Sequence, residues 1–83
     1  MKIQLKLVCP EIFGAMPSGQ YEVPENCTAQ EALECCTAQY EGDDIMRDSI
    51  GRVVYMINGK HVSPDRTVGE NDMLMVLRPV FGG

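Results

Sequence analysis

The group with the clearest chemistry in this chain is the α-carboxylate of Gly83. It follows Gly82 and an apolar run, residues 73–81, that reads as a strand continuing into a tail. Glycines carry no side chain and reach backbone conformations closed to other residues, so such a tail can enter a channel too narrow for ordinary residues. From Pro79 to Gly83 the extended chain spans roughly 17 Å at ~3.3 Å per residue. The tail is therefore suited to modification by another enzyme, and a frayed terminus without a role is the alternative.

Four cysteines raise the possibility of a metal site or a disulfide. They are Cys9, Cys27, Cys35 and Cys36. Zinc sites use cysteine pairs separated by two to four residues, and plant-type iron–sulfur sites need a C-x₄-C-x₂-C run, and neither spacing occurs. The adjacent Cys35 and Cys36 cannot both face one metal from a regular helix. We expect no metal site and no disulfides, but small buried or half-buried thiols.

Residues that would make the chain an enzyme in its own right are not apparent. His61 has no aspartate or cysteine at a spacing that suggests a catalytic triad, and we expect it to be an ordinary surface residue. The sequence contains no glycine-rich phosphate loop, paired catalytic carboxylates or nucleophile elbow. The chain is therefore predicted to be acted upon, and to bind no cofactor itself.

Size and charge limit the class of protein. A chain of 83 residues forms one small domain, predicted at residues 1–78, with residues 79–83 as a flexible tail. The net charge of -5 argues against binding nucleic acid and favours a basic protein surface as partner. No apolar run is long enough to span a bilayer, and the first residues alternate in polarity, unlike a signal peptide. We expect a cytoplasmic protein that does not bind membranes.

The elements that position the tail follow from periodicity and turn residues. Period-two alternation predicts a strand at residues 2–8, and turn-rich residues 9–19 lead to a short strand at 20–23. Thr28 or Asn26 can cap a helix that ends near Tyr40, and Thr28 with Glu31 has the form of a capping box. Residues 41–52 are predicted to be a loop, and strands at 53–57 and 60–62 flank the hairpin turn Asn58-Gly59. Residues 64–71 form a connector, and residues 72–78 form the last strand.

This order predicts an α+β fold of the β-grasp type, a mixed sheet of about five strands with one main helix on one face. We place the first and last strands side by side in the middle of the sheet, parallel to each other. On the helix, the buried face is predicted to contain Ala29, Ala32, Leu33, Cys36 and Tyr40, with Gln30, Glu31, Glu34, Thr37 and Gln39 outside and Cys35 at the edge.

The last strand is apolar on both sides, yet one helix covers only one face of a sheet. Either residues 41–52 fold over the second face, or an apolar patch is left there for a partner. For that patch we select Leu74 and Val76, with Lys60 and Arg78 as charges that can serve the same interface or simply be solvated.

A resemblance to a known family is carried by residues 54–60, Val62, residues 70–72 and residues 77–83. Together these parts of the chain resemble the ubiquitin-like sulfur carriers of the ThiS/MoaD kind. The most specific feature is Arg78-Pro79-Val80-Phe81-Gly82-Gly83 at the end of an apolar strand. In these families the C-terminal glycine is adenylated by a partner related to ubiquitin-activating enzymes and then becomes a thiocarboxylate. By position the reacting group belongs to Gly83, and residues 78–82 are the part that enters the partner's active site. Phe81 departs from the small residue that often precedes the glycines.

The resemblance implies a set of partners: the adenylating enzyme, a sulfur donor and a synthase subunit that accepts the sulfur. ATP and magnesium are used by the activating partner, because the ionised carboxylate of Gly83 needs only a bound α-phosphate to attack. The product made with the sulfur is left open between molybdopterin, thiamin and other metabolites. Two alternative functions remain: a ubiquitin-like modifier joined to lysines through Gly83, and a β-grasp binding module that nothing activates.

Overall fold

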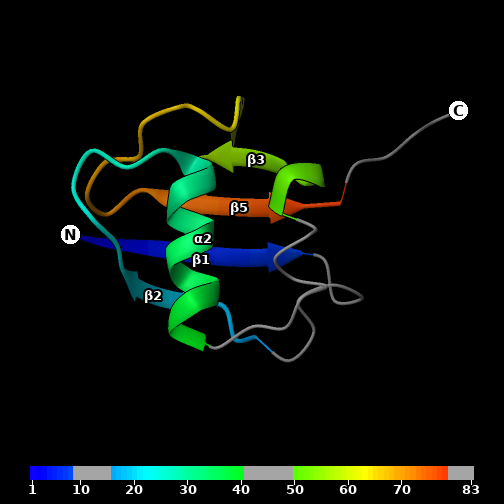
Figure 1. Ribbon diagram of the computed structural model, residues 1–83. Coiled ribbons are helices and arrows are strands. Elements are labelled where there is room, and N and C mark those ends of the chain that lie inside the picture. The colour runs from blue at the N-terminus through cyan, green and yellow to red at the C-terminus, as the bar shows by residue number, and fades with distance from the viewer. Residues whose placement is uncertain (9–15, 41–49, 79–83) are drawn as a thin grey trace, which may run out of the picture.

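The computed structural model describes residues 1–8, 16–40 and 50–78 (Figure 1). In chain order the elements are β1 (Lys2–Val8), β2 (Gly19–Glu22), α2 (Ala29–Tyr40), the short 3₁₀ helix η1 (Ile50–Arg52), β3 (Val54–Ile57), β4 (Lys60–Val62) and β5 (Met73–Leu77). Every predicted strand is present, with ends within about one residue of those expected from the pattern. The loops predicted within residues 9–15 and 41–49 lie outside the described residues, as do residues 79–83.

The five strands form one mixed sheet in the order β2-β1-β5-β3-β4. β1 and β5 lie side by side in the middle and run parallel, while the other neighbouring pairs are antiparallel. Helix α2 crosses one face of this sheet (Figure 1). This confirms the α+β fold class and the central placement of the first and last strands.

The start of α2 is defined by the predicted capping box. The hydroxyl of Thr28 accepts a hydrogen bond from the Glu31 amide at 3.1 Å, and the Glu31 carboxylate accepts one from the Thr28 amide at 2.9 Å. The next two amide donors, at Ala29 and Gln30, reach backbone carbonyls of the connector before β5. The first N–H groups of a helix have no partner within the helix. Because these two donate to the connector instead, the start of α2 is joined to it.

The buried face of α2 differs from the prediction at its last turn. Ala29, Ala32, Leu33 and Cys36 are buried as expected, but Tyr40 is 38% exposed. Thr37, predicted to face solvent, is instead 3% exposed, and its hydroxyl donates to the carbonyl of Glu34 at 2.9 Å. A threonine can be buried at this position because that intrahelical bond satisfies its only polar side-chain group.

The two faces of the sheet have different surroundings. Leu74 and Val76 on β5 are both 0% exposed and belong to the core beneath α2, together with Ile3 and Leu5 of β1. The prediction that Leu74 and Val76 form an exposed partner surface is therefore wrong. Strand alternation places their side chains on the helix face, and the intervening residues of β5 on the other.

Residues 50–52 do not cover the second face of the sheet. They form η1, which contacts α2, and Ile50 is buried in the same core. The carbonyl of Ile50 accepts a hydrogen bond from the Tyr55 hydroxyl at 2.8 Å, which fixes η1 against the helix side. Burial raises the pKa of Tyr55, so this hydroxyl stays a donor at neutral pH.

The turn between β3 and β4 is linked to the start of β5. Asn58 and Gly59 have φ of 52° and 84°, the left-handed pair that a type I′ hairpin needs. The Asn58 side chain donates to the Asp72 carboxylate and accepts from the Met73 amide, both at 2.9 Å. The same Asp72 carboxylate accepts from the Gly69 amide at 2.7 Å. The predicted hairpin thus also fixes where β5 begins.

Candidate functional site

Strand β5 determines where the C-terminal tail leaves the domain. Its last residue, Leu77, is in register with Val8 of β1 on one side and with Val54 of β3 on the other. Arg78 follows directly and is exposed. A strand held by two neighbours keeps its end in one place, so the chain enters the tail from a fixed point. The predicted tail residues Pro79, Val80, Phe81, Gly82 and Gly83 lie beyond the described residues.

The face of the sheet opposite α2 carries an apolar patch, which we name the open face. It consists of Val8 on β1, Val54 and Met56 on β3, and Met73, Met75 and Leu77 on β5. Val8 and Met73 are 43% and 38% exposed, and the other four are half-buried. Within residues 1–8, 16–40 and 50–78, no helix or strand lies over it. The alternation of apolar residues along β3 and β5 indicates such a face, and the residues of β5 that lie on it are Met73, Met75 and Leu77, not the predicted Leu74 and Val76.

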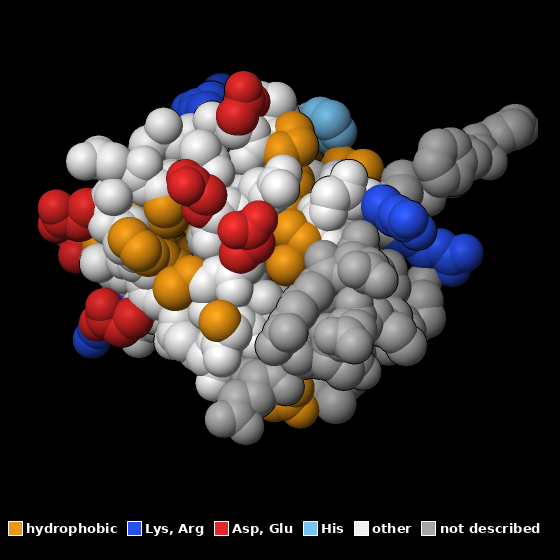
Figure 2. All heavy atoms as spheres, in the orientation of Figure 1, with side chains coloured by type: hydrophobic (Ala, Val, Ile, Leu, Met, Phe, Trp, Pro, Cys, Tyr) orange, Lys and Arg blue, Asp and Glu red, His pale blue; other side chains and the backbone are white. Residues whose placement is uncertain are grey.

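Positive charges lie close to the point where the tail begins. Lys6 is in register with Met75, and Arg52 is two residues before Val54, the partner of Leu77. Both side chains are exposed, as is Arg78. Figure 2 shows Lys and Arg side chains beside the end of the described chain, and Asp and Glu side chains spread over the helix face.

Lys60 does not join this cluster. Its register partner on β3 is Ile57, which is buried on the helix side and in turn pairs with Leu74 near the start of β5. Lys60 therefore lies at the end of the sheet away from the tail, and its expected role beside Leu74 and Val76 is not supported. His61, in register with Met56, is exposed on the open-face side.

The cysteines that the structure describes are free thiols, as expected. Cys27 and Cys36 are buried, and Cys35 is half-buried at the edge of α2. Burial raises the pKa of Cys36 to about 12, with a further contribution from the neighbouring Cys35 and Cys27. Burial also raises the pKa of Cys27. Such thiols are poor nucleophiles, because the thiolate is the reactive form. Among the described residues, no His, Cys, Asp and Glu cluster has metal-binding geometry.

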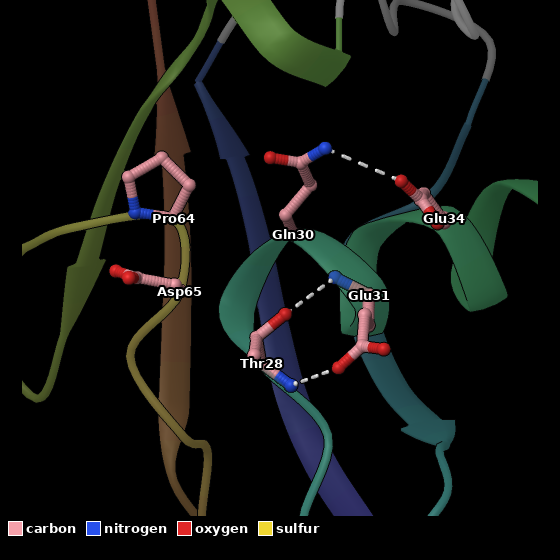
Figure 3. Close-up of a pocket in the computed structure, with 6 residues that line it drawn as sticks. All are labelled: Thr28, Gln30, Glu31, Glu34, Pro64 and Asp65. Carbon is pink, nitrogen blue, oxygen red and sulfur yellow. Dashed lines mark hydrogen bonds between the residues drawn. The ribbon is translucent and has the colours of Figure 1, made fainter.

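An open hollow of about 410 Å³ lies where α2 begins (Figure 3). Its lining residues are Thr28, Gln30, Glu31, Glu34, Pro64 and Asp65. The Glu31 carboxylate already accepts from Thr28, and Glu34 accepts from Gln30 at 3.4 Å. No histidine or cysteine lines it, and the hydroxyl of Thr28 and the carboxylates of Glu31 and Glu34 are engaged in local hydrogen bonds, so the geometry assigns the hollow no chemistry.

The fold and the exit of β5 define the class of protein. Three solved structures cover nearly all of this chain with a TM-score of 0.68. Two are of small archaeal modifier protein 1, SAMP1, from Haloferax volcanii. The first is 16% identical to this chain, and the match covers 100% of both chains. The second is 17% identical, and the match covers 95% of this chain and 98% of that one. The third is assigned as molybdopterin converting factor, subunit 1, from Pyrococcus furiosus, at 22% identity, covering 96% of this chain and 99% of that one. The chain is thus a β-grasp protein of the ubiquitin-like type.

The family follows from the sequence itself. The ThiS family model matches residues 11–83, a span that includes β5 and the diglycine end, and the chain belongs to this family. Its members are small ubiquitin-like sulfur carriers that work with activating enzymes and synthase subunits and are not catalysts themselves. No curated protein sequence matches the chain. In the part of the chain that the structure describes, no helix is long and apolar enough to cross a membrane.

Proposed function

We propose that this protein carries sulfur as a thiocarboxylate on Gly83. The observation that supports this most is the family match, which runs through the last residue and so includes Gly82-Gly83. The geometry is compatible with it, because β5 delivers the chain to the tail from the centre of the sheet. The five residues from Pro79 to Gly83 span roughly 17 Å when extended, a length that can place the terminal carboxylate inside an enzyme while the domain stays outside.

The reaction uses two steps in the active site of the adenylating partner. A carboxylate oxygen of Gly83 attacks the α-phosphorus of ATP, and pyrophosphate leaves, which gives an acyl-adenylate. A sulfur nucleophile at the oxidation level of sulfide, delivered by the sulfur donor, then attacks the acyl carbon and AMP leaves. The product is a thiocarboxylate whose sulfur can attack an electrophilic acceptor in a synthase. The chain contributes the ionised carboxylate and an unhindered diglycine; the partner supplies magnesium and charge stabilisation.

Neither the thiols nor His61 is placed for catalysis in the part of the chain that the structure describes. Among the described residues the thiols are buried or lie against backbone: the Cys35 sulfur lies 3.8 Å from the Glu22 carbonyl and accepts from the Gln39 amide at 3.4 Å. His61 has no catalytic partner on its short strand. A role as carried substrate, rather than as enzyme, is consistent with this arrangement. Whether the sulfur goes to molybdopterin, thiamin or another product is a separate question that the acceptor decides.

The test is the intact mass of untagged protein purified from its own cells, followed by mapping of the C-terminal peptide. We expect a fraction of molecules in which one oxygen of Gly83 is replaced by sulfur. A chain without Gly83 should keep the same far-UV circular dichroism and lose both the sulfur and the ATP-dependent activation. A plain carboxylate that persists with ATP, sulfur donor and adenylating enzyme present would contradict the proposal.

A second function, protein modification, is supported by the similarity to small archaeal modifier protein 1. The same acyl-adenylate would then be captured by a lysine amine of another protein, which forms an isopeptide bond to Gly83. Peptide mapping of cell extracts for lysines that carry the C-terminal glycines distinguishes the two functions. Conjugates that disappear when Gly83 is deleted would establish modification, and both functions can share one activation step.

A further inference from the structure

We propose that Asn58 is a site of spontaneous chemical modification, at which the side-chain amide is lost by cyclisation onto Gly59, and that Asp72 restrains this reaction in the folded protein. The inference goes beyond the carrier function and does not depend on the fate of Gly83. Three observations support it: the residue that follows Asn58, the exposure of the turn, and the hydrogen bonds that hold the asparagine side chain.

The first observation is the pair of residues in the turn between β3 and β4. Glycine has no Cβ, so its backbone nitrogen can approach the side-chain carbonyl carbon of a preceding asparagine with little steric hindrance. The chain contains three asparagines, and only Asn58 precedes a glycine, whereas Asn26 and Asn71 do not. All three have a positive φ. The following residue is therefore what distinguishes Asn58.

The reaction needs only water. The backbone nitrogen of Gly59 attacks the side-chain carbonyl carbon of Asn58 and loses its proton to water, and the side-chain nitrogen leaves as ammonia. The product is a cyclic imide, a succinimide. Water then opens the ring at one of its two carbonyl groups, which gives either aspartate or isoaspartate, in which the backbone runs through the β-carboxyl group. The net change is one water taken up and one ammonia released.

The second observation is that the turn is open to solvent. Asn58 and Gly59 are both exposed. Apart from its chain neighbours, no described atom lies within 4 Å of the position that a Cβ of Gly59 would take. Water and base can therefore reach the reacting atoms without displacing a packed side chain.

The third observation is that the fold holds the Asn58 side chain away from this reaction. Its nitrogen donates to the Asp72 carboxylate, and its oxygen accepts from the Met73 amide, both at 2.9 Å. Asp72 is half-buried and also accepts from the Gly69 amide at 2.7 Å. Cyclisation requires the Asn58 side chain to leave these partners and turn toward Gly59. The Met73 donor belongs to the backbone, so Asp72 is the side chain that opposes the reaction.

The products would weaken the attachment of the turn to β5. Aspartate at position 58 has no side-chain N–H to donate, and it would place a second carboxylate where the amide now lies 2.9 Å from Asp72. Two carboxylates at that distance repel each other. Isoaspartate adds a backbone carbon to a hairpin turn whose conformation depends on its length. Modification would therefore release the contact that fixes the start of the last strand.

The test follows the intact protein over time in mildly alkaline buffer. Trypsin cuts after Arg52 and Lys60 and releases residues 53–60, a peptide in which Asn58 is the one asparagine. Chromatography with mass spectrometry separates its asparagine, aspartate and isoaspartate forms. We expect conversion to be at least about tenfold faster in urea than in the folded protein, because unfolding removes the hydrogen bonds to Asp72 and Met73. Isoaspartate should be among the products in urea.

Matched variants assign the restraint to Asp72. We expect Asp72→Ala to speed conversion of Asn58 in the folded protein by about tenfold, as loss of a hydrogen bond to a charged group should. Asp72→Asn keeps an oxygen acceptor, so its rate should lie between those of the wild type and Asp72→Ala. The control is Thr28→Ala, which weakens the fold through the helix cap and leaves the partners of Asn58 in place. The urea midpoint of each variant is measured alongside its rate.

Several results would overturn the proposal. Equal acceleration by Asp72→Ala and Thr28→Ala at a similar loss of stability would mean that the reaction follows global unfolding. Unchanged conversion in Asp72→Ala would exclude the restraint, and slower conversion would show that the carboxylate assists the reaction as a base. Equal rates in the folded protein and in urea would show that the fold gives no protection. Conversion of Asn26 or Asn71 as fast as that of Asn58 would exclude the role of the following glycine.

Discussion

Replacing Leu74 by alanine should destabilise this protein severely, whereas the same change at the adjacent Met73 should not. Leu74 is 0% exposed and lies between Leu5 of β1 and Ile57 of β3, both of which are buried. A rigid sheet on both sides cannot collapse into the cavity, so the cost should fall in the upper part of the usual Leu→Ala range, about 3–5 kcal/mol. Met73, at 38% exposure on the open face, should cost about 1 kcal/mol.

The size of the first effect matters because a domain of this length has little stability to lose. At ~0.05–0.15 kcal/mol per residue, 83 residues correspond to a free energy of unfolding of about 4–12 kcal/mol. Leu74→Ala should therefore remove about a quarter of the stability or more, and lower the midpoint of thermal unfolding by roughly 12–40 °C.

Urea unfolding followed by far-UV circular dichroism is the suitable assay, because the chain contains no tryptophan for fluorescence. Both variants should keep the wild-type denaturant dependence, so that the shift in midpoint reports stability directly. Equal losses for Leu74→Ala and Met73→Ala would refute the assignment of the two faces of β5. A larger loss at Met73 would mean that the apolar layer packs on the face we describe as open.

Three further predictions concern local interactions. Thr28→Ala should cost about 1 kcal/mol in unfolding free energy by loss of the helix cap, and adding Glu31→Ala should cost less than the sum because the two bonds form one box; a double-mutant cycle in urea measures this. Cys36 should resist iodoacetamide in the folded state. Because its pKa rises from 9.0 to about 12 on folding, its contribution to the free energy of unfolding is fully present below pH 9 and is lost as the pH rises toward about 12. Cys36→Ala should flatten that alkaline loss, and an unchanged slope would argue against the raised pKa. Asn58→Ala should lower the free energy of unfolding by about 2 kcal/mol, because it removes the hydrogen bonds to Asp72 and the Met73 amide and leaves alanine at a strained positive φ. Asn58→Gly should lower it less, since glycine tolerates that φ. Equal losses would exclude strain as a component.

Much of this fold follows from short-range patterns. The alternation of Ile3 and Leu5 with lysines, the capping box at Thr28, and the Asn58-Gly59 turn each depend on neighbouring residues, and all three are where the pattern places them. The parallel pairing of the first and last strands also followed, because both are rich in apolar residues and the chain between them is long enough for the crossover. The family resemblance likewise rested on a contiguous C-terminal motif.

The sequence was less informative where two choices had equal local support. Leu74 and Met75 are both apolar neighbours on one strand, and periodicity alone cannot say which of them faces the helix. Tyr40 and Thr37 stand one turn apart near the end of α2, and their burial depends on where the sheet beneath the helix ends and on the bond from Thr37 to Glu34.

The sequence by itself determined the elements, their order and the chemical group at the terminus, because each depends on local periodicity, turn residues and the identity of the last residues. Only the tertiary structure decided which face of β5 is covered, because register with β1 and β3 sets the direction of every side chain at once. It also separated Lys60 from the start of the tail and placed Lys6 beside Met75 of the open face. These are contacts between residues far apart in the chain, and their free energy comes from packing that no local pattern encodes.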